Sequence, residues 1–119
     1  MPTNDVEELQ MRVFGLISGA GEAKSNFYEA LEMARLGKYD EAEQCKKNGQ
    51  QALKQAHRVQ TDLITEEASG TKTEVGILMV HAQDHLMNTI LVKELLDQLI
   101  TMQKEINVLK QQLGVVKHG

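Results

Sequence analysis

The sequence predicts an all-α protein, an antiparallel three-helix bundle that assembles into a homo-oligomer. The first observation is composition: the 119 residues include one proline, no tryptophan and only 3% aromatic residues, whereas strong helix formers are abundant. The second is periodicity, because apolar residues recur every three or four positions in three long segments. With 41% hydrophobic and 25% charged residues, the chain is suited to one folded domain.

Charge and cysteine content exclude several classes of protein. Thirteen Lys and Arg stand against 17 Asp and Glu, for a net charge of -4, and the signs are interspersed, which argues against a nucleic-acid partner. A single cysteine, Cys45, excludes an intrachain disulfide framework and fits a reducing compartment. The N-terminal residues do not form a secretory signal. We therefore expect a cytoplasmic protein.

A first helix is predicted over residues 4–36. Thr3, Asn4 and Asp5 are candidate N-caps, and Gly37 is the candidate C-cap. Its small and apolar residues form one stripe: Val6, Leu9, Val13, Leu16, Ala20, Ala23, Phe27, Ala30 and Ala34. Three glycines inside it are expected to mark a kink or a close approach of another helix: Gly15, Gly19 and Gly21.

A second helix is predicted over 40–67, where Asp40 and Glu43 resemble a capping box. Its stripe consists mainly of small residues, which allow another helix to come close: Ala42, Cys45, Gly49, Ala52, Ala56, Val59 and Leu63. The polar segment 66–72 is predicted to be a surface loop.

A third helix is predicted over 72–113, followed by a tail at 114–119, and Thr71 with Glu74 is its candidate capping box. Its seam is expected to be the following set: Leu78, His81, His85, Asn88, Val92, Leu95, Leu99, Met102, Ile106, Leu109 and Leu113. Between residues 75 and 91 the helix is apolar almost all round. Because two partner helices cannot bury every side of a third, we expect this half to meet other subunits.

Three titratable side chains interrupt this apolar segment. His81, Asp84 and His85 are spaced i, i+3 and i+4, so they lie on one side of a helix. Buried polar groups need partners, and three interpretations remain open: a structural polar network, a metal site on a helical bundle, or nucleophilic chemistry at a histidine. The spacing alone does not separate them.

Several segments carry a family resemblance. The string ILMVHAQDHLMNTILVKELL resembles the third helix of the lactose/cellobiose/chitobiose-type IIA proteins of the bacterial sugar phosphotransferase system. FGLISGAGEAKSNFYEAL and AHRVQTDLI are similar to the first and second helices of that family. The resemblance extends over almost the whole chain, and VHAQDHLM is its most specific part.

The resemblance implies a homotrimer with nine helices in total. It implies a phosphotransferase component that accepts a phosphoryl group from the histidine-containing phosphocarrier protein HPr and passes it to a cysteine of the cognate IIB protein, which works with a membrane IIC protein to take up a β-linked disaccharide. His81 would be the phosphorylated residue, through Nε2. Asp84 would bind a divalent cation, Mg²⁺, together with its copies in the other subunits. His85 and Gln83 would be auxiliary residues.

The remaining candidates receive less specific predictions. His57 and Gln60 are placed on the second helix, where they line the site of a neighbour or serve the structure; Cys45 is interpreted as a small buried hydrophobe, and His118 as part of a frayed tail. The segment LGKYDEA is similar to the turn of a tetratricopeptide repeat, so a peptide-binding adaptor is a further alternative, although no second copy is present.

Overall fold

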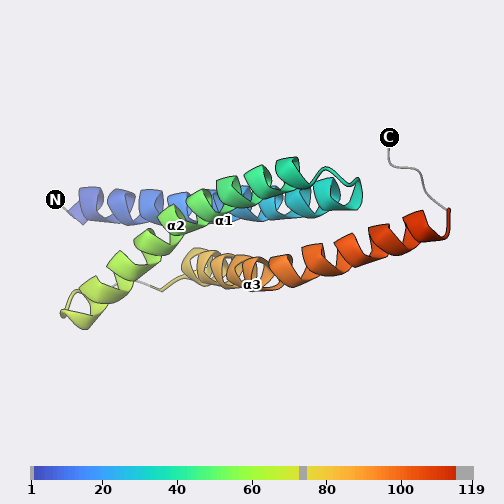
Figure 1. Cartoon of the computed structure of the whole chain (residues 1–119). Coiled ribbons are helices and arrows are strands. Elements are labelled where there is room, and N and C mark those ends of the chain that lie inside the picture. The colour runs from blue at the N-terminus through green and yellow to red at the C-terminus, as the bar shows by residue number, and fades with distance from the viewer. Residues whose placement is uncertain (1, 73–74, 115–119) are drawn as a thin grey trace.

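The chain forms three long antiparallel helices. The computed structural model describes residues 2–72 and 75–114, in which α1 spans Pro2–Arg35, α2 spans Tyr39–Ala68 and α3 spans Ile77–Gln112. The bundle is a rod of 67 × 20 × 20 Å (Figure 1). No strand occurs in the described ranges. The all-α three-helix prediction is therefore confirmed.

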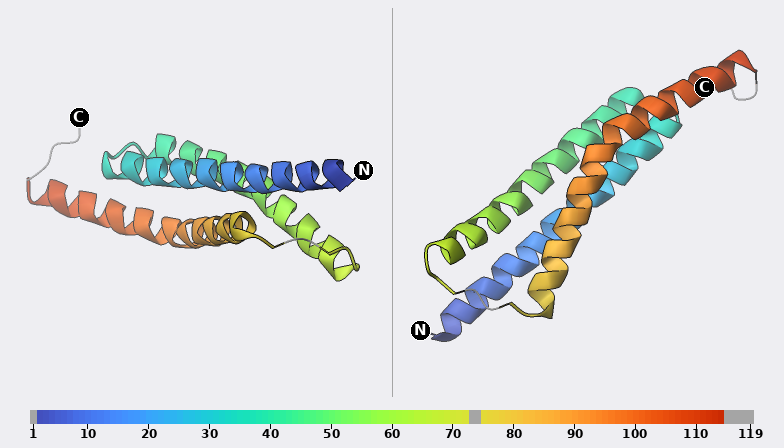
Figure 2. Two further views of the ribbon diagram at one scale, coloured as in Figure 1. Left: turned by 180° about the vertical axis from the view of Figure 1, so that it is seen from behind. Right: turned by 90° about the horizontal axis from the view of Figure 1, so that it is seen from below.

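The helix α1 holds the other two together. It packs along both α2 and α3, whereas α2 and α3 diverge toward the end where α2 stops and α3 begins (Figure 2). At the opposite end, α3 continues past the turn between α1 and α2 (Figure 1). The bundle is therefore open on the side between α2 and α3.

The predicted stripes of the first two helices form the core. From Val13 to Ala34 every α1 residue of the stripe is buried, and Phe27 is its largest member, with no exposed surface. In α2 the buried stripe residues are Ala42, Gly49, Ala52, Ala56 and Leu63, together with the half-buried Cys45 and Val59. The prediction misses only at the start of α1, where Val6 is 52% exposed.

Small residues let α1 and α2 approach closely. A Cβ added to Gly19 would lie 3.1 Å from the Cβ of Ala56, and a Cβ added to Gly49 would lie 2.5 Å from a ring carbon of Phe27. The expected close approach is therefore confirmed at Gly19, whereas Gly15 faces open space. Gly49 is the position where the ring of Phe27 fits into α2.

The predicted seam of α3 is wrong by a rotation of the helix. The core-facing residues are instead Met79, Ala82, Leu86, Thr89, Leu96 and Asn107, again at three- and four-residue spacing. The predicted seam is exposed or half-buried at every position; Leu95 is 45% exposed, and Met102 is 57% exposed. Because α3 is apolar on more than one side, its sequence contains two stripes, and the one with Thr89 and Asn107 packs inside the chain.

Two helices end at glycines with positive φ, α1 at Gly37 as predicted and α2 at Gly70. Gly37 has φ 78°, and its N–H and that of Lys38 donate to the carbonyls of Ala34 and Met33 at 3.0 and 2.8 Å. Gly70 has φ 103° and ends α2 in the same way. This arrangement satisfies carbonyls that a helix end leaves without a donor. The α2 C-terminus lies slightly later than predicted, so the loop begins after Ala68.

The predicted starts of the helices need correction. The α1 helix begins at Pro2, so its three predicted N-caps lie inside it, as a proline in the first turn permits. The N-cap of α2 is Lys38, and Asp40 lies in the first turn, where a carboxylate stabilises the positive end of the helix. The α3 helix begins at Ile77 after Gly76, so Thr71 does not cap it; Glu74 lies outside the described residues.

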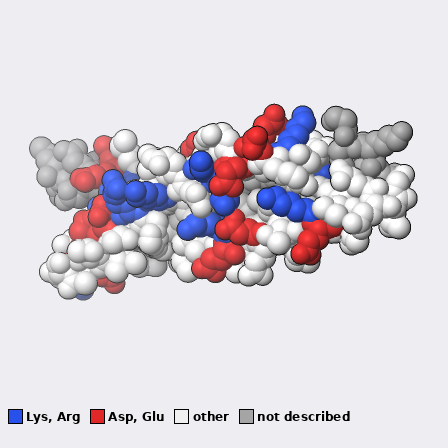
Figure 3. Space-filling model, in the orientation of Figure 1, with Lys and Arg blue, Asp and Glu red and all other residues white. Residues whose placement is uncertain are grey.

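Polar contacts tie the helices together at intervals. Arg12 of α1 makes a two-pronged ion pair with Glu66 of α2, and Lys46 of α2 pairs with Asp97 of α3 at 2.9 Å. The buried Asn107 donates from its amide nitrogen to the carbonyl of Ala34 at 3.0 Å. Figure 3 shows acidic and basic side chains mixed over the visible face.

The pair between Arg12 and Glu66 predicts a pH dependence of stability. The hydrogen bond from Arg12 lowers the pKa of Glu66, so this contribution is present above the ordinary glutamate pKa and is lost as pH falls through the lowered value. We expect Glu66→Gln to melt below wild type at neutral pH, with the difference vanishing in acid. Circular dichroism melts across the acidic range measure this, and a difference that persists unchanged at the lowest pH contradicts the assignment.

Candidate functional site

The polar cluster of α3 lies near the start of the helix, on its surface. His81 and Asp84 are exposed, whereas His85 and Gln83 are half-buried. All four belong to one continuous helix, so their relative directions follow from its geometry of about 100° per residue. No loop has to close to assemble them.

The two histidines stack side by side. Their rings are 6.0 Å apart between centroids and are nearly parallel, with an interplanar angle of 9°. One turn separates them along α3, as the i, i+4 spacing predicts. His85 is the inner member, and its Nε2 faces Gly21 of α1. His81 is the outer member, so its imidazole is accessible to a macromolecule approaching from solvent.

Asp84 lies on the outer face of α3. Its Oδ2 accepts a hydrogen bond from the amide of Asn88 at 3.4 Å, and both side chains are exposed. Leu91 and Leu95 continue the same face, at 52% and 45% exposure. The carboxylate therefore begins an apolar stripe that the chain itself leaves uncovered.

Gln83 does not join the histidines within one chain. It is two residues from His81, about 200° around the helix, and its Oε1 accepts a hydrogen bond from Nε2 of Gln60 in α2. Gln60 is only 8% exposed. The sequence grouped Gln60 with His57, but the structure pairs it with Gln83, so this amide pair is a bridge across the diverging helices.

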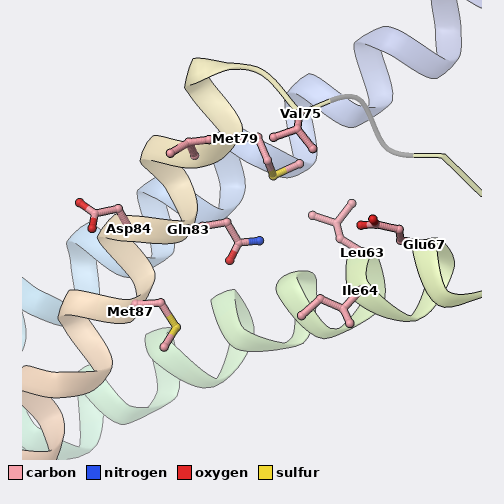
Figure 4. A pocket seen from close by; sticks show the side chains of 9 residues that line it. Leu63, Ile64, Glu67, Val75, Met79, Gln83, Asp84 and Met87 are labelled. Atoms are coloured by element: carbon pink, nitrogen blue, oxygen red, sulfur yellow. The ribbon is translucent and has the colours of Figure 1, made fainter.

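A cleft opens beside this bridge. It has a volume of about 410 Å³ and lies between the end of α2 and the start of α3 (Figure 4). In Figure 4 Gln83 points toward α2 and Asp84 points away from it. The lining is mainly apolar and includes Leu63, Ile64, Val75, Met79 and Met87. Gln83 and Asp84 are the members of the polar cluster that line this cleft, whereas His81 does not.

The structure does not bring the three titratable residues together as a metal site within one chain. Across residues 2–72 and 75–114, no three His, Cys, Asp or Glu side chains converge in a group able to hold a metal ion. His85 lies against Gly21 of α1, whereas Asp84 points away from α2 and is exposed. The described residues of one chain therefore do not support a metal site formed by His81, Asp84 and His85.

The other candidates lie apart from the cluster. His57 lines a separate groove of about 400 Å³ between α2 and α3, with Lys54 and Lys93 at its edge. Burial is the main cause that raises the pKa of the half-buried Cys45, so its thiol is protonated at neutral pH. His118 lies outside the described residues. His81 does not line the groove at His57.

The fold and the site together define a class: an all-α bundle of three helices with a histidine, His81, exposed near the start of α3. No helix in the described part of the chain has the length and apolarity needed to cross a membrane. The model of the family "PTS system, Lactose/Cellobiose specific IIA subunit" matches residues 11–104. The chain belongs to this family of phosphotransferase system IIA components.

Relatives and solved structures agree with the family model. A lactose-specific EIIA component of Staphylococcus epidermidis is 38% identical over 83% of this chain and 95% of its own length. A crystal structure of the cellobiose-specific enzyme IIA from Bacillus anthracis superposes with a TM-score of 0.81, at 43% identity over 84% of this chain and 92% of that one.

A third comparison concerns a complex. The IIA(chitobiose) protein of Escherichia coli, solved in solution together with HPr, superposes with a TM-score of 0.72. It is 38% identical over 83% of this chain and 96% of its own. The family excludes the tetratricopeptide alternative, and the segment LGKYDEA forms the turn between α1 and α2 together with the first residues of α2.

Proposed function

We propose that this chain is a phosphoryl carrier, which accepts a phosphoryl group on His81 from HPr and passes it to a cysteine of a cognate IIB protein. The observation that carries the proposal is the exposure of His81 near the start of α3, in a member of the IIA family. A IIA relative solved as a complex with HPr supports HPr as the donor.

The chemistry places few demands on the protein. The lone pair on Nε2 of a neutral His81 attacks phosphorus, a new N–P bond forms, and the N–P bond of the donor breaks with its electron pair returning to the donor imidazole. The second transfer exchanges the N–P bond for an S–P bond on IIB. Such a carrier contributes positioning and charge stabilisation rather than a strong base.

The experiment is a direct transfer assay. The purified chain is incubated with phosphoenolpyruvate, enzyme I and HPr, and intact mass spectrometry records whether it gains one acid-labile phosphoryl group. Addition of a IIB protein should then remove that group. A chain that remains unmodified when all donors are active contradicts the proposal.

A trimer of this chain is part of the proposal. The outer stripe of α3 follows the spacing of a coiled coil and is 40–57% exposed at its apolar positions: Leu91, Leu95, Leu99, Met102, Ile106 and Leu109. A stripe of this length is far larger than the scattered apolar residues of monomers. Copies of α3 that pack on one another through this stripe would bury it and bring three Asp84 side chains to the axis.

A divalent cation, Mg²⁺, would hold those carboxylates together. Oxygen ligands suit this ion, and Asp84 is exposed, with Asn88 as its one hydrogen-bond partner among the described residues. Bound there, the cation would offset two of the three negative charges and so support the assembly. It takes no part in the transfer at His81.

The shared site predicts the effect of a substitution at Asp84. Asp84→Leu should preserve the trimer and raise its melting temperature in the presence of a chelator, because it removes three repelling carboxylates and extends the apolar stripe. Light scattering and melts with and without chelator measure this. A stable monomer at micromolar concentration contradicts the trimer, and a wild type that is insensitive to chelator contradicts the metal.

The identity of the transported sugar does not depend on this chain. Its relatives are named for lactose, cellobiose and chitobiose at similar identity, and a IIA protein never contacts the sugar. We propose uptake of a β-linked disaccharide, with IIB and IIC partners choosing it, and a cytoplasmic location where those partners meet.

A further inference from the structure

The inner histidine rests against the backbone of α1 at a glycine. A Cβ added to Gly21 would lie 3.5 Å from Nε2 of His85, which is ordinary van der Waals contact. The His85 ring therefore lies next to the position that a side chain at residue 21 would occupy. Both residues are partly exposed, so the contact lies at the edge of the polar cluster.

A buried hydroxyl fixes the backbone next to this contact. Thr89 is fully buried, and its Oγ1 lies 2.9 Å from the carbonyl oxygen of His85 and 3.3 Å from that of Ala20. One hydroxyl hydrogen serves both acceptors, so Thr89 ties the backbone of His85 to the residue that precedes Gly21. Ala20 and Ala82 have no exposed surface, so α1 and α3 are closely packed at this level.

The His85 ring is consequently held from two directions. Its backbone is fixed through Thr89, and its Nε2 edge stops at Gly21. On the other side lies the parallel ring of His81, 6.0 Å away between centroids. A Cβ at position 21 would be in ordinary contact with the His85 ring, and a larger, branched side chain there would extend past the Cβ toward the ring.

We propose that Gly21 is a positioning residue for phosphoryl transfer, because it leaves the space in which His85 lies beside His81 without crowding it. The inference rests on the proposed role of His81 as the phosphorylated residue. A phosphoryl group bound to Nε2 of His81 needs room next to His85. Gly21 acts through His85 and touches neither donor nor acceptor.

Two substitutions of different size test the space. In Gly21→Ala the Cβ takes up an ordinary contact, whereas in Gly21→Val the γ carbons reach beyond it into the ring. We expect Gly21→Val to lower the transfer rate at saturating phosphorylated HPr roughly tenfold or more, since small misplacements at a reacting centre have effects of that order. The concentration of HPr at half-maximal rate should change less than about twofold. Gly21→Ala should show a clearly smaller loss.

Gly15→Val is the matched control. Gly15 lies in the same helix, and a Cβ there meets no atom within 4 Å. The control therefore carries the same cost of a β-branched residue in a helix without a contact to His85. It should transfer at the wild-type rate, and its melting temperature reports how much of any loss in Gly21→Val is merely structural.

A spectroscopic measurement makes the test independent of the transfer reaction. The imidazole resonances of His81 and His85 are recorded by NMR in the unphosphorylated proteins. Gly21→Val should shift both sets, because ring currents and ring positions change together, whereas Gly15→Val should leave them in place. This readout stands even if the chain accepts no phosphoryl group, so failure of the proposed function and failure of this inference are told apart.

Shifted resonances together with a selective loss of maximal rate support the inference. Unshifted resonances in Gly21→Val overturn it, because the side chain is then accommodated without moving His85. Shifted resonances with an unchanged transfer rate also overturn it, because the position of His85 then has no bearing on the reaction.

Discussion

The substitution His81→Gln is expected to abolish phosphoryl acceptance from HPr. Glutamine has a similar volume and keeps a nitrogen, but its amide nitrogen has no available lone pair to attack phosphorus. Because His81 is exposed and belongs to no buried contact, helicity and assembly should not change. Intact mass spectrometry after incubation with the complete donor system measures the loss.

His85→Gln is the companion variant for that experiment. It alters the inner ring next to His81, so transfer should be slowed and still reach completion. If His81→Gln still gains an acid-labile phosphoryl group while His85→Gln does not, the roles of the two histidines are exchanged. Light scattering and circular dichroism on both variants ensure that neither result reflects a change of assembly.

The substitution Gly49→Ala should destabilise the chain, although alanine is the better helix former. The added Cβ would lie 2.5 and 2.7 Å from ring carbons of Phe27 and 3.1 Å from the carbonyl oxygen of Ala23. Phe27 is fully buried and Ala23 contributes backbone, so neither can yield. Overpacking of this kind costs about 1–3 kcal/mol, which exceeds the helix-propensity gain of up to about 1 kcal/mol.

Gly15→Ala is the control for the same chemical change. Its Cβ meets no atom within 4 Å, so only the propensity gain remains and stability should rise by about 0.5–1 kcal/mol. Denaturant melts of the three proteins at one concentration give the comparison. A stabilised Gly49→Ala protein would show that Phe27 does not fill the notch in α2.

The first two helices were predictable because each has one continuous stripe of small and apolar residues. Once α1 is written out at helical spacing, its alanines fall with Val13, Leu16 and Phe27 on one side of the helix, and this side is the buried one. The same holds for α2 from Ala42 to Leu63. A pattern with one solution gives the buried face directly.

The third helix was not predictable in the same way. Its apolar residues satisfy the helical period in two registers, and the register that packs against α1 contains Thr89 and Asn107. A rule that places polar residues outside selects the wrong face. Thr89 and Asn107 can be buried because the fold supplies hydrogen-bond partners for them: carbonyl groups of α1 accept hydrogen bonds from both side chains.

The candidate site divides along similar lines. The local grouping of His81 with His85 follows from their spacing alone, and the stacked rings have that arrangement. The bridge between Gln60 and Gln83 and the contact of His85 with Gly21 join residues 23 and 64 positions apart, in different helices. No local pattern marks such a pair, and only the resemblance singled out His81 within the cluster.

The short turn between α1 and α2 bears on how the chain acquires its shape. Three residues, 36–38, connect two helices that pack along nearly their whole length, whereas α3 joins them through a longer connection and meets α2 at few points. Local contacts form fastest, so the α1–α2 hairpin should be the early folding unit and α3 should dock later. Amide hydrogen exchange would then show two levels of protection, because α3 would open before α1 and α2.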